Sequence, residues 1–350
     1  MLLKYLQAAR GFAALAVLLF HYSIMLEDER FLGYRVLENY TGKGDLGVDF
    51  FFVLSGFIIC AAHVQDIGRP GRLRAFIAKR VLRIYPLYLC VTVGLMSLLA
   101  IGLGGVKQLP ALPEEWLLNL TLIRLDASVP LLAPAWTLVH EMAFYVMFAG
   151  LILNRKIGFA LMFAWVILCL AHFVFPLPVE RGLINTYLSG YNVLFFFGIA
   201  SYILFSRFAL DSGLAISLIG LSVVWLAVAS HFAPPGWEGT GYRIVFGVAF
   251  AVAIWALSSL ERVRGGVVPA FLLLLGDASY SIYLTHELFL SQLSKLAIKH
   301  GLFETIGLNV TYFLVVSISV FAGIVIHKFV EFPLTMRLRR RFINQKSLSS

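Results

Sequence analysis

Two histidines and two carboxylates stand inside long apolar stretches of this chain, where titratable side chains are uncommon. His21 and His286 lie near opposite ends of the sequence, and Asp49 and Glu141 lie between them. Ionisable groups in hydrocarbon are energetically costly and usually mark a functional site. Imidazole takes and releases a proton near neutral pH, and a carboxylate can orient the ring and stabilise its cation. These residue types predict general acid–base chemistry.

Arginines form a second group with chemical potential. Arg10 precedes His21 by eleven residues, close to three helical turns, so both lie on one helix face about 16 Å apart along the axis. Arg80 and Arg83 stand at the start of another apolar stretch. Guanidinium groups bind phosphate oxygens in pairs. We therefore expect the three arginines to bind an anionic cofactor near the inner membrane boundary, and the four titratable residues to share a depth nearer the outside.

Each of these residues also has a structural interpretation. A lone histidine in a membrane helix commonly hydrogen-bonds a neighbouring helix. For Asp49 and Glu141, holding an arginine or a histidine in place fits the sequence as well as direct chemistry does. Arg80 and Arg83 by themselves fit the excess of positive charge in cytoplasmic segments. His63 lies at an inner helix end, where snorkelling accounts for it.

The composition predicts that membrane helices position these groups. Hydrophobic residues make up 60% of the chain and charged residues 13%, and the mean hydropathy is +0.87. About 20 apolar residues suffice for a helix to cross the bilayer. We therefore expect an all-α polytopic membrane protein, with a single transmembrane domain over residues 1–350 and no soluble second domain. The ten predicted spans lie near residues 8–26, 46–64, 84–103, 134–153, 157–175, 187–205, 214–230, 241–258, 268–290 and 305–327.

Lysine and arginine predict the orientation, because cytoplasmic segments carry an excess of them. With the N-terminus inside, 19 of the 28 fall in inner segments and 9 in outer ones. Both termini are therefore expected in the cytoplasm, and residues 104–133 form an outer loop with a short interfacial helix at 116–122. The net charge of +9 follows from this topology and from attraction to anionic membrane lipids, and requires no nucleic acid.

Motifs for metals and nucleotides are missing from the sequence. The three cysteines Cys60, Cys90 and Cys169 lie in apolar stretches without metal-ligand spacing, so we expect neither a disulfide nor a metal site. His140 and Glu141 begin like a zinc-protease motif, but Phe144 replaces its second histidine. Ser55 is not in a GxSxG elbow.

Five blocks of sequence resemble the acyltransferase-3 family of bacterial membrane acyltransferases, and among its members the exopolysaccharide O-acetyltransferases most. The blocks follow the family's order and span nearly the whole chain. Two positions depart from the family pattern: Thr137 stands where serine is common, and His140 precedes the motif glutamate. The blocks are LQAARGFAAL (6–15, continuing to His21), GVDFFFVLSGF (47–57), RVLRIYP (80–86), WTLVHEMAFY (136–145) and LGDASYSIYLTH (275–286).

This resemblance implies ten helices in the bacterial inner membrane, an acyl-CoA donor that is usually acetyl-CoA, and a carbohydrate hydroxyl as acceptor. It implies that Arg10 and His21 form the core pair and that Arg80 and Arg83 contribute to donor binding. Asp49 and Glu141 are then partners in catalysis. The secondary candidates within the blocks are His140, which could compete with His21 as the base, His286, Ser55 and Tyr85.

Several alternatives stay open at this point. The main rival function is a proton-coupled secondary transporter, whose histidines and carboxylates would form a proton relay, although the chain lacks repeated halves. Direct transfer and an acyl-histidine intermediate both fit the residues. The acceptor is a carbohydrate or a lipid-linked glycan, and it could be an exopolysaccharide, a lipopolysaccharide, a Nod-type oligosaccharide or a small glycosylated product. The sequence does not define the oligomeric state.

Overall fold

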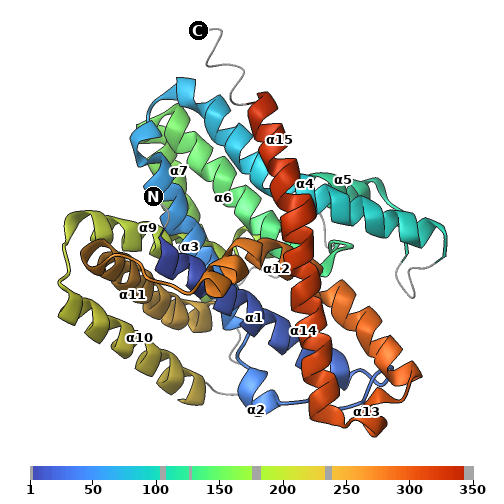
Figure 1. Ribbon diagram of the computed structural model, residues 1–350. Helices are drawn as coiled ribbons and strands as arrows, with labels where there is room; N and C mark the ends of the chain where they lie inside the picture. The colour runs from blue at the N-terminus through green and yellow to red at the C-terminus, as the bar shows by residue number, and fades with distance from the viewer. Residues whose placement is uncertain (1–2, 103–107, 126–127, 176–182, 233–238, 343–350) are drawn as a thin grey trace. The chain divides into compact units, whose positions relative to one another are not determined.

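The computed structural model describes residues 3–102, 108–125, 128–175, 183–232 and 239–342 (Figure 1). Every regular element in these ranges is helical, which confirms the predicted all-α fold. Lys107, Arg181 and Lys346, which entered the charge count for the topology, lie outside the described residues.

Within the described ranges, nine helical segments are long and apolar enough to cross a membrane. They coincide with nine of the ten predicted spans. The third begins about eleven residues earlier than predicted, because α4 already starts at Leu73 and includes Arg80 and Arg83. The chain is thus a multi-pass membrane protein. The segments are Lys4–Glu27, Glu38–Asp66, Pro70–Ala100, Ala133–Leu153, Arg155–Val174, Leu183–Arg207, Ser212–Phe232, Thr240–Arg264 and Leu308–Arg341.

The remaining predicted span, 268–290, is helical but is not among these nine. It forms α12 (Ala270–Lys299), which is longer than predicted and carries many polar residues. Ser279, Ser281, Thr285 and His286 on this helix are all buried. Because α12 packs on α1 and α14, these polar groups face protein instead of lipid. Its low hydropathy therefore reflects an interior position.

The chain folds into two compact units. The first unit contains Met1–Val48 and Gly266–Pro333, and therefore joins the two ends of the sequence. In it, α12 packs against both α1 and α14, as Figure 1 shows. Its elements are α1 (Lys4–Glu27), α2 (Glu38–Thr41), α12, α13 (Leu302–Thr305), α14 (Leu308–Ile326) and the π-helix η4 (His327–Glu331).

Two glycines let α1 and α12 approach closely. A Cβ atom added to Gly11 would lie 2.9 Å from the Cβ of Leu275, and one added to Gly276 would overlap the carbonyl oxygen of Gln7. The side chain of Gln7 also crosses this contact, since its Nε2 donates to Asp277 Oδ1 at 2.6 Å. Small residues at such crossings are typical of membrane helix pairs. This contact fixes the register of α1 against α12.

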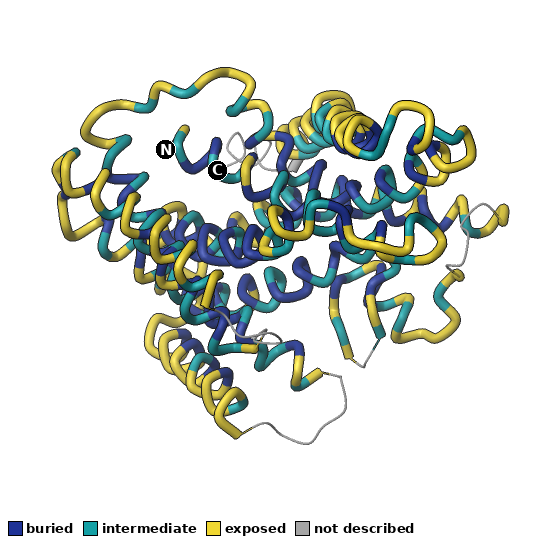
Figure 2. The backbone as a smooth tube through the Cα atoms, turned by 90° about the horizontal axis from the view of Figure 1, so that it is seen from below, coloured by how far each residue is buried: buried dark blue, intermediate teal, exposed yellow. Residues whose placement is uncertain are grey.

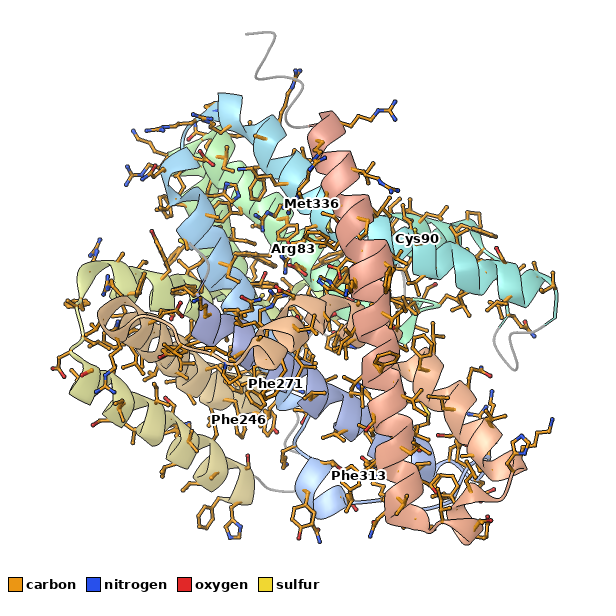
Figure 3. All side chains as sticks on the ribbon, in the orientation of Figure 1. Arg83, Cys90, Phe246, Phe271, Phe313 and Met336 are labelled. Carbon is orange, nitrogen blue, oxygen red and sulfur yellow. The ribbon has the colours of Figure 1, made fainter. Side chains whose placement is uncertain are left out.

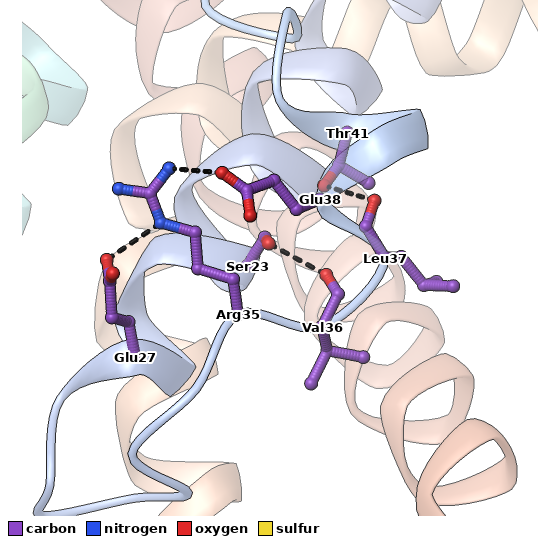
Figure 4. Close-up of polar contacts among 7 residues, drawn as sticks. All are labelled: Ser23, Glu27, Arg35, Val36, Leu37, Glu38 and Thr41. Atoms are coloured by element: carbon purple, nitrogen blue, oxygen red, sulfur yellow. Dashed lines mark hydrogen bonds and ion pairs between the residues drawn. The ribbon is translucent and has the colours of Figure 1, made fainter.

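The loop after α1 folds back onto that helix through polar contacts (Figure 4). Arg35 bridges Glu27 and Glu38, at 2.8 and 2.9 Å, and Ser23 donates to the carbonyl of Val36 at 2.7 Å. Nearby, the hydrogen bonds and charge of Arg30 lower the pKa of Asp28 to about 2. The two arginines of this predicted outer loop are therefore matched by acids.

The second unit contains Asp49–Gly265 and Leu334–Ser350. Helix α6 packs against α4, α7 and α9, and α11 packs against α9 and α10. Short helices α5 and α8 join the long ones, and the predicted interfacial helix at 116–122 is α5. The elements are α3 (Leu46–His63, from Asp49 onward), α4 (Leu73–Ala100), α5 (Pro113–Thr121), α6 (Trp136–Leu153), α7 (Arg155–Val174), α8 (Leu183–Tyr187), α9 (Gly190–Arg207), α10 (Ser212–Phe232), α11 (Thr240–Arg264) and most of α15 (Phe332–Phe342).

Helices of both units bury one face and expose the other (Figure 2). The extreme case is α10, in which the buried positions are Ala215 and Ser222, while most of its large apolar side chains are exposed. In water such a surface would be unfavourable, whereas lipid tails solvate it. The exposed apolar faces therefore fit the multi-pass membrane fold.

Candidate active site

His21 and His286 meet in the first unit. Nδ1 of His21 lies 3.1 Å from Nε2 of His286, and the ring centroids are 5.1 Å apart. His286 is buried, with 1% of its surface exposed, while His21 is only partly buried. The close crossing of α1 and α12 aligns the two rings. We call His21 and His286 the histidine pair.

The hydrogen-bond network sets the tautomers of the histidine pair. Nδ1 of His286 lies 2.6 Å from the carbonyl oxygen of Tyr283, and a carbonyl can only accept, so this nitrogen carries the hydrogen. Nε2 of a neutral His286 is then an acceptor, and it receives the hydrogen of His21 Nδ1. Nε2 of His21 therefore keeps its lone pair. That nitrogen is the one able to take a proton from a substrate.

Glu287 completes a group of possible metal ligands with the histidine pair, because one ligand atom from each of the three residues lies within 4.8 Å of the others. Two histidines and a glutamate can bind a catalytic zinc ion. The hydrogen bond between the two rings already explains why they lie close together. The expectation of a metal-free site stays a prediction.

Arg10 lies on the same unbroken helix as His21, as the eleven-residue spacing predicts. Arg10 is half-buried. It belongs to the first unit, whereas Arg80 and Arg83 belong to the second. The predicted grouping of the three arginines therefore stays a prediction. The same holds for the common depth of the four titratable residues, because Asp49 and Glu141 also lie in the second unit.

Glu141 accepts two hydrogen bonds in the middle of the second unit. Ser55 Oγ donates to Glu141 Oε1 at 3.2 Å, and the hydroxyl of Tyr145 donates to the same oxygen. Tyr145 sits one turn after Glu141 on α6, while Ser55 comes from α3. The structure thus brings the secondary candidate Ser55 to the motif glutamate, and Ser55 acts as a donor that orients this carboxylate.

Asp49 forms a buried ion pair with Arg243 of α11. Arg243 Nη1 donates to Asp49 Oδ1 at 2.8 Å, and the side chains are 8% and 0% exposed. Asp49 precedes Ser55 by six residues on α3, about 9 Å of helical rise. The Asp49–Arg243 ion pair and the Ser55–Glu141 hydrogen bond therefore lie at different levels along α3. Asp49 is an arginine partner, one of the two roles that the sequence left open.

Arg80 is positioned by a chain of hydrogen bonds at the other end of α3. Its Nη2 lies 3.3 Å from His63 Nε2, and His63 Nδ1 lies 2.8 Å from Asp66 Oδ2. The ring of Tyr145 lies 5.8 Å from the Arg80 guanidinium. His63 is 2% exposed, so the expectation that it snorkels toward water is wrong. Asp66 orients the imidazole of His63, which in turn holds Arg80.

A third arginine lies beside Arg80 and Arg83. Helix α15 passes beside Arg83, as the labelled Met336 shows (Figure 3), and Arg339 on this helix is close enough to both α4 arginines to repel them electrostatically. Like charges held together are destabilising unless an anion balances them. The phosphate-binding role of Arg80 and Arg83 stays a prediction, and Arg339 adds a third cation to this group.

Two secondary candidates have structural contacts. His140 is 5% exposed, and its Nδ1 donates to Asn192 Oδ1 at 2.9 Å within a cluster of aromatic rings. The hydroxyl of Tyr85 donates to the carbonyl of Thr121 at 2.5 Å and so ties α4 to α5. Both residues already hold neighbouring helices together, which accounts for them without a catalytic role.

Three residues with contacts in the second unit were not among the predicted site residues: Arg243, Asn192 and Arg339. Arg243 is one of the nine lysines and arginines counted in outer segments, whereas its side chain is buried against Asp49. The sequence did indicate a buried role for Arg243, because a charged side chain at the start of an apolar stretch needs a partner. For Asn192 and Arg339 the sequence offered no such indication, since their contacts depend on helix packing.

Together these features describe a multi-pass membrane protein with a histidine pair in one unit and a carboxylate and an arginine cluster in the other. The chain belongs to the acyltransferase-3 family, whose model, described as an acyltransferase domain, matches residues 3–328. It is similar to the exopolysaccharide production protein ExoZ of Rhizobium meliloti (strain 1021), with 31% identity over 318 residues, which are 85% of this chain and 92% of that protein. No solved structure matches the chain.

Proposed function

We propose that this protein is an O-acyltransferase that moves an acyl group, acetyl in the first instance, from cytoplasmic acyl-CoA to a carbohydrate hydroxyl of an exported glycan. The observation that carries the proposal is the histidine pair, because its tautomers leave Nε2 of His21 as a base. A sugar hydroxyl is a weak nucleophile that needs such a base. Membership of an acyltransferase family supports this function over proton-coupled transport.

The reaction needs two proton transfers and the exchange of a C–S bond for a C–O bond. Nε2 of His21 takes the proton of the acceptor hydroxyl while the hydroxyl oxygen attacks the thioester carbonyl. The C–S bond then breaks, CoA leaves as the thiolate, and the imidazolium of His21 returns the proton to sulfur. His286 accepts the hydrogen bond from His21 Nδ1 and stabilises the transient positive charge.

Donor binding is assigned to the arginines. The phosphates of CoA are anions that guanidinium groups bind in pairs. We assign this role to Arg80 and Arg83, supported by their position beside Arg339, and we assign Arg10 to guiding the donor along α1 toward His21. Glu141, held by Ser55 and Tyr145, is assigned a supporting role in catalysis as an oriented carboxylate of the second unit, and no metal ion is included in the proposal.

The acceptor is proposed to be an exopolysaccharide or its lipid-linked precursor, since the relative is an exopolysaccharide production protein. We expect deletion of the protein to remove an acetyl mass from the surface polysaccharide in mass spectrometry. The wild-type chain should restore this mass, and an equally expressed His21→Ala variant should not. An unchanged acetyl content after deletion would contradict the proposal.

We propose that the protein lies in the bacterial inner membrane as one domain with both termini in the cytoplasm. Ten helices would then cross, with α12 as the ninth, which accounts for a terminal helix so rich in arginine. Cysteines introduced at residues 34 and 116 should react with an impermeant thiol reagent added outside intact cells, and cysteines at residues 68 and 342 should not. Labelling of residue 342 from outside would contradict an even number of crossings.

A further inference from the structure

A pocket of about 350 Å³ opens in the second unit, beside the Asp49–Arg243 ion pair. It lies where α7 ends and where α9 and α11 begin. A volume in this range suits a small ligand. Among the side chains that line it are His172, Phe173, Asn185, Ser189, Tyr191 and Arg243.

The charge of the arginine that lines this pocket is balanced, and its side chain is held by packing. The guanidinium of Arg243 pairs with Asp49 at 2.8 Å and lies 4.5 Å from the centroid of the Tyr191 ring. Tyr191 in turn packs against Trp136, with ring centroids 4.8 Å apart. The charge of Arg243 is thus matched by a buried carboxylate. An anionic ligand would gain little here, whereas a neutral ligand would meet polar groups that are already positioned.

The walls offer hydrogen-bonding groups together with one apolar surface. Nε2 of His172 lies 3.0 Å from Asn185 Oδ1, which fixes the side-chain amide at the rim. Ser189 and Thr240 add hydroxyl groups, and a Cβ on Gly190 would lie 2.5 Å from Thr240 Oγ1, so the starts of α9 and α11 are in close contact. Phe173 is 44% exposed at the same place.

This combination points to a sugar. A pyranose presents hydroxyl groups around its edge and C–H groups on its faces, so it needs amide and hydroxyl partners beside an aromatic surface. We infer that the pocket is a binding subsite for a neutral saccharide unit of the acceptor glycan. That the saccharide is part of the acceptor rests on the proposed function. Binding of a saccharide to the pocket can be measured without acyl transfer.

The position of the pocket fits a two-substrate enzyme. Asp49, which holds the pocket arginine, and His63, which holds Arg80, are fourteen residues apart on α3, about 21 Å of helical rise. Glu141 contacts α3 between them, at Ser55. Within this unit, the saccharide and the phosphorylated donor would therefore bind toward opposite ends of α3.

The test compares two double variants with the same residue changes. Phe173→Ala with Asn185→Ala removes the aromatic surface and the amide of the pocket. Asn309→Ala with Phe313→Ala changes two exposed residues of α14 in the first unit and serves as the control. We expect the pocket variant to raise KM for a de-acetylated oligosaccharide from the host polysaccharide about tenfold, with kcat and KM for acetyl-CoA unchanged. The control should match wild type in all three.

Direct binding of the same oligosaccharide to the purified protein separates this inference from the proposed function. Binding that is lost in the pocket variant and kept in the control would support the subsite, even if no acyl transfer were detected. Equal binding by wild type and the pocket variant, or an unchanged KM for the oligosaccharide, would overturn it. A stronger response to an anionic sugar than to its neutral counterpart would also overturn it.

Discussion

Replacing His21 by alanine is expected to lower acyl transfer by about 10²- to 10⁴-fold, which is the usual contribution of a general base. The change removes the nitrogen that takes the proton of the acceptor hydroxyl. It leaves the α1 backbone intact, and alanine is the best helix former. Acetylation of the oligosaccharide by purified protein measures the effect, and recovery from the membrane fraction confirms insertion.

His286 provides the matched comparison. His286→Ala removes the acceptor of the His21 hydrogen, whereas His286→Gln keeps an acceptor and should retain more activity. EDTA should leave the wild-type rate unchanged. Near wild-type transfer by a normally inserted His21→Ala variant would refute its role as base, and a rate lost with EDTA and restored by zinc would show that the histidines and Glu287 bind a metal.

Replacing Arg80 or Arg83 by alanine is expected to weaken acetyl-CoA binding about ten- to a hundredfold. Each change removes charge-assisted contacts worth roughly 1.5–3 kcal/mol. Lysine at either position should restore binding only in part, because it keeps the charge but loses the planar fork. Binding of acetyl-CoA to the detergent-solubilised protein measures both effects.

Arg262 is a suitable control for these variants. It is an exposed arginine at the end of α11, where it stacks on Phe205 at 4.3 Å and contacts the carbonyl of Phe208. Arg262→Ala should leave acetyl-CoA binding unchanged. If the Arg80→Lys, Arg83→Lys double variant bound acetyl-CoA as tightly as wild type, the two arginines would serve orientation in the membrane alone.

Hydrophobic length predicted the fold well because the bilayer leaves few alternatives. A membrane-spanning segment has to satisfy its backbone hydrogen bonds internally, so apolar runs become helices. The sequence could not predict how far helices extend beyond the hydrocarbon. Helix α12, for example, continues to Lys299. Its hydropathy was also misleading, because Ser281 and Thr285 lower it yet lie buried against other helices.

The sequence predicted which residues belong to the candidate site better than it predicted the residues they contact. Titratable groups in apolar stretches identified His21, His286, Asp49 and Glu141. Their partners depend on which helices pack together and in which register. Asp49 therefore paired with an unexpected arginine, and His286, only a secondary candidate, became the partner of His21.

The pairing of α1 with α12 has a consequence for how the enzyme is made. His21 and His286 are 265 positions apart, and at about 5–20 residues per second a ribosome needs tens of seconds to synthesise the chain between them. Throughout that time α1 is in the membrane without the helix that covers it, and its polar residues depend on other helices or on assembly factors. The histidine pair forms only when α12 arrives. A nascent or truncated chain that ends before His286 therefore lacks the histidine pair on which the proposed function depends.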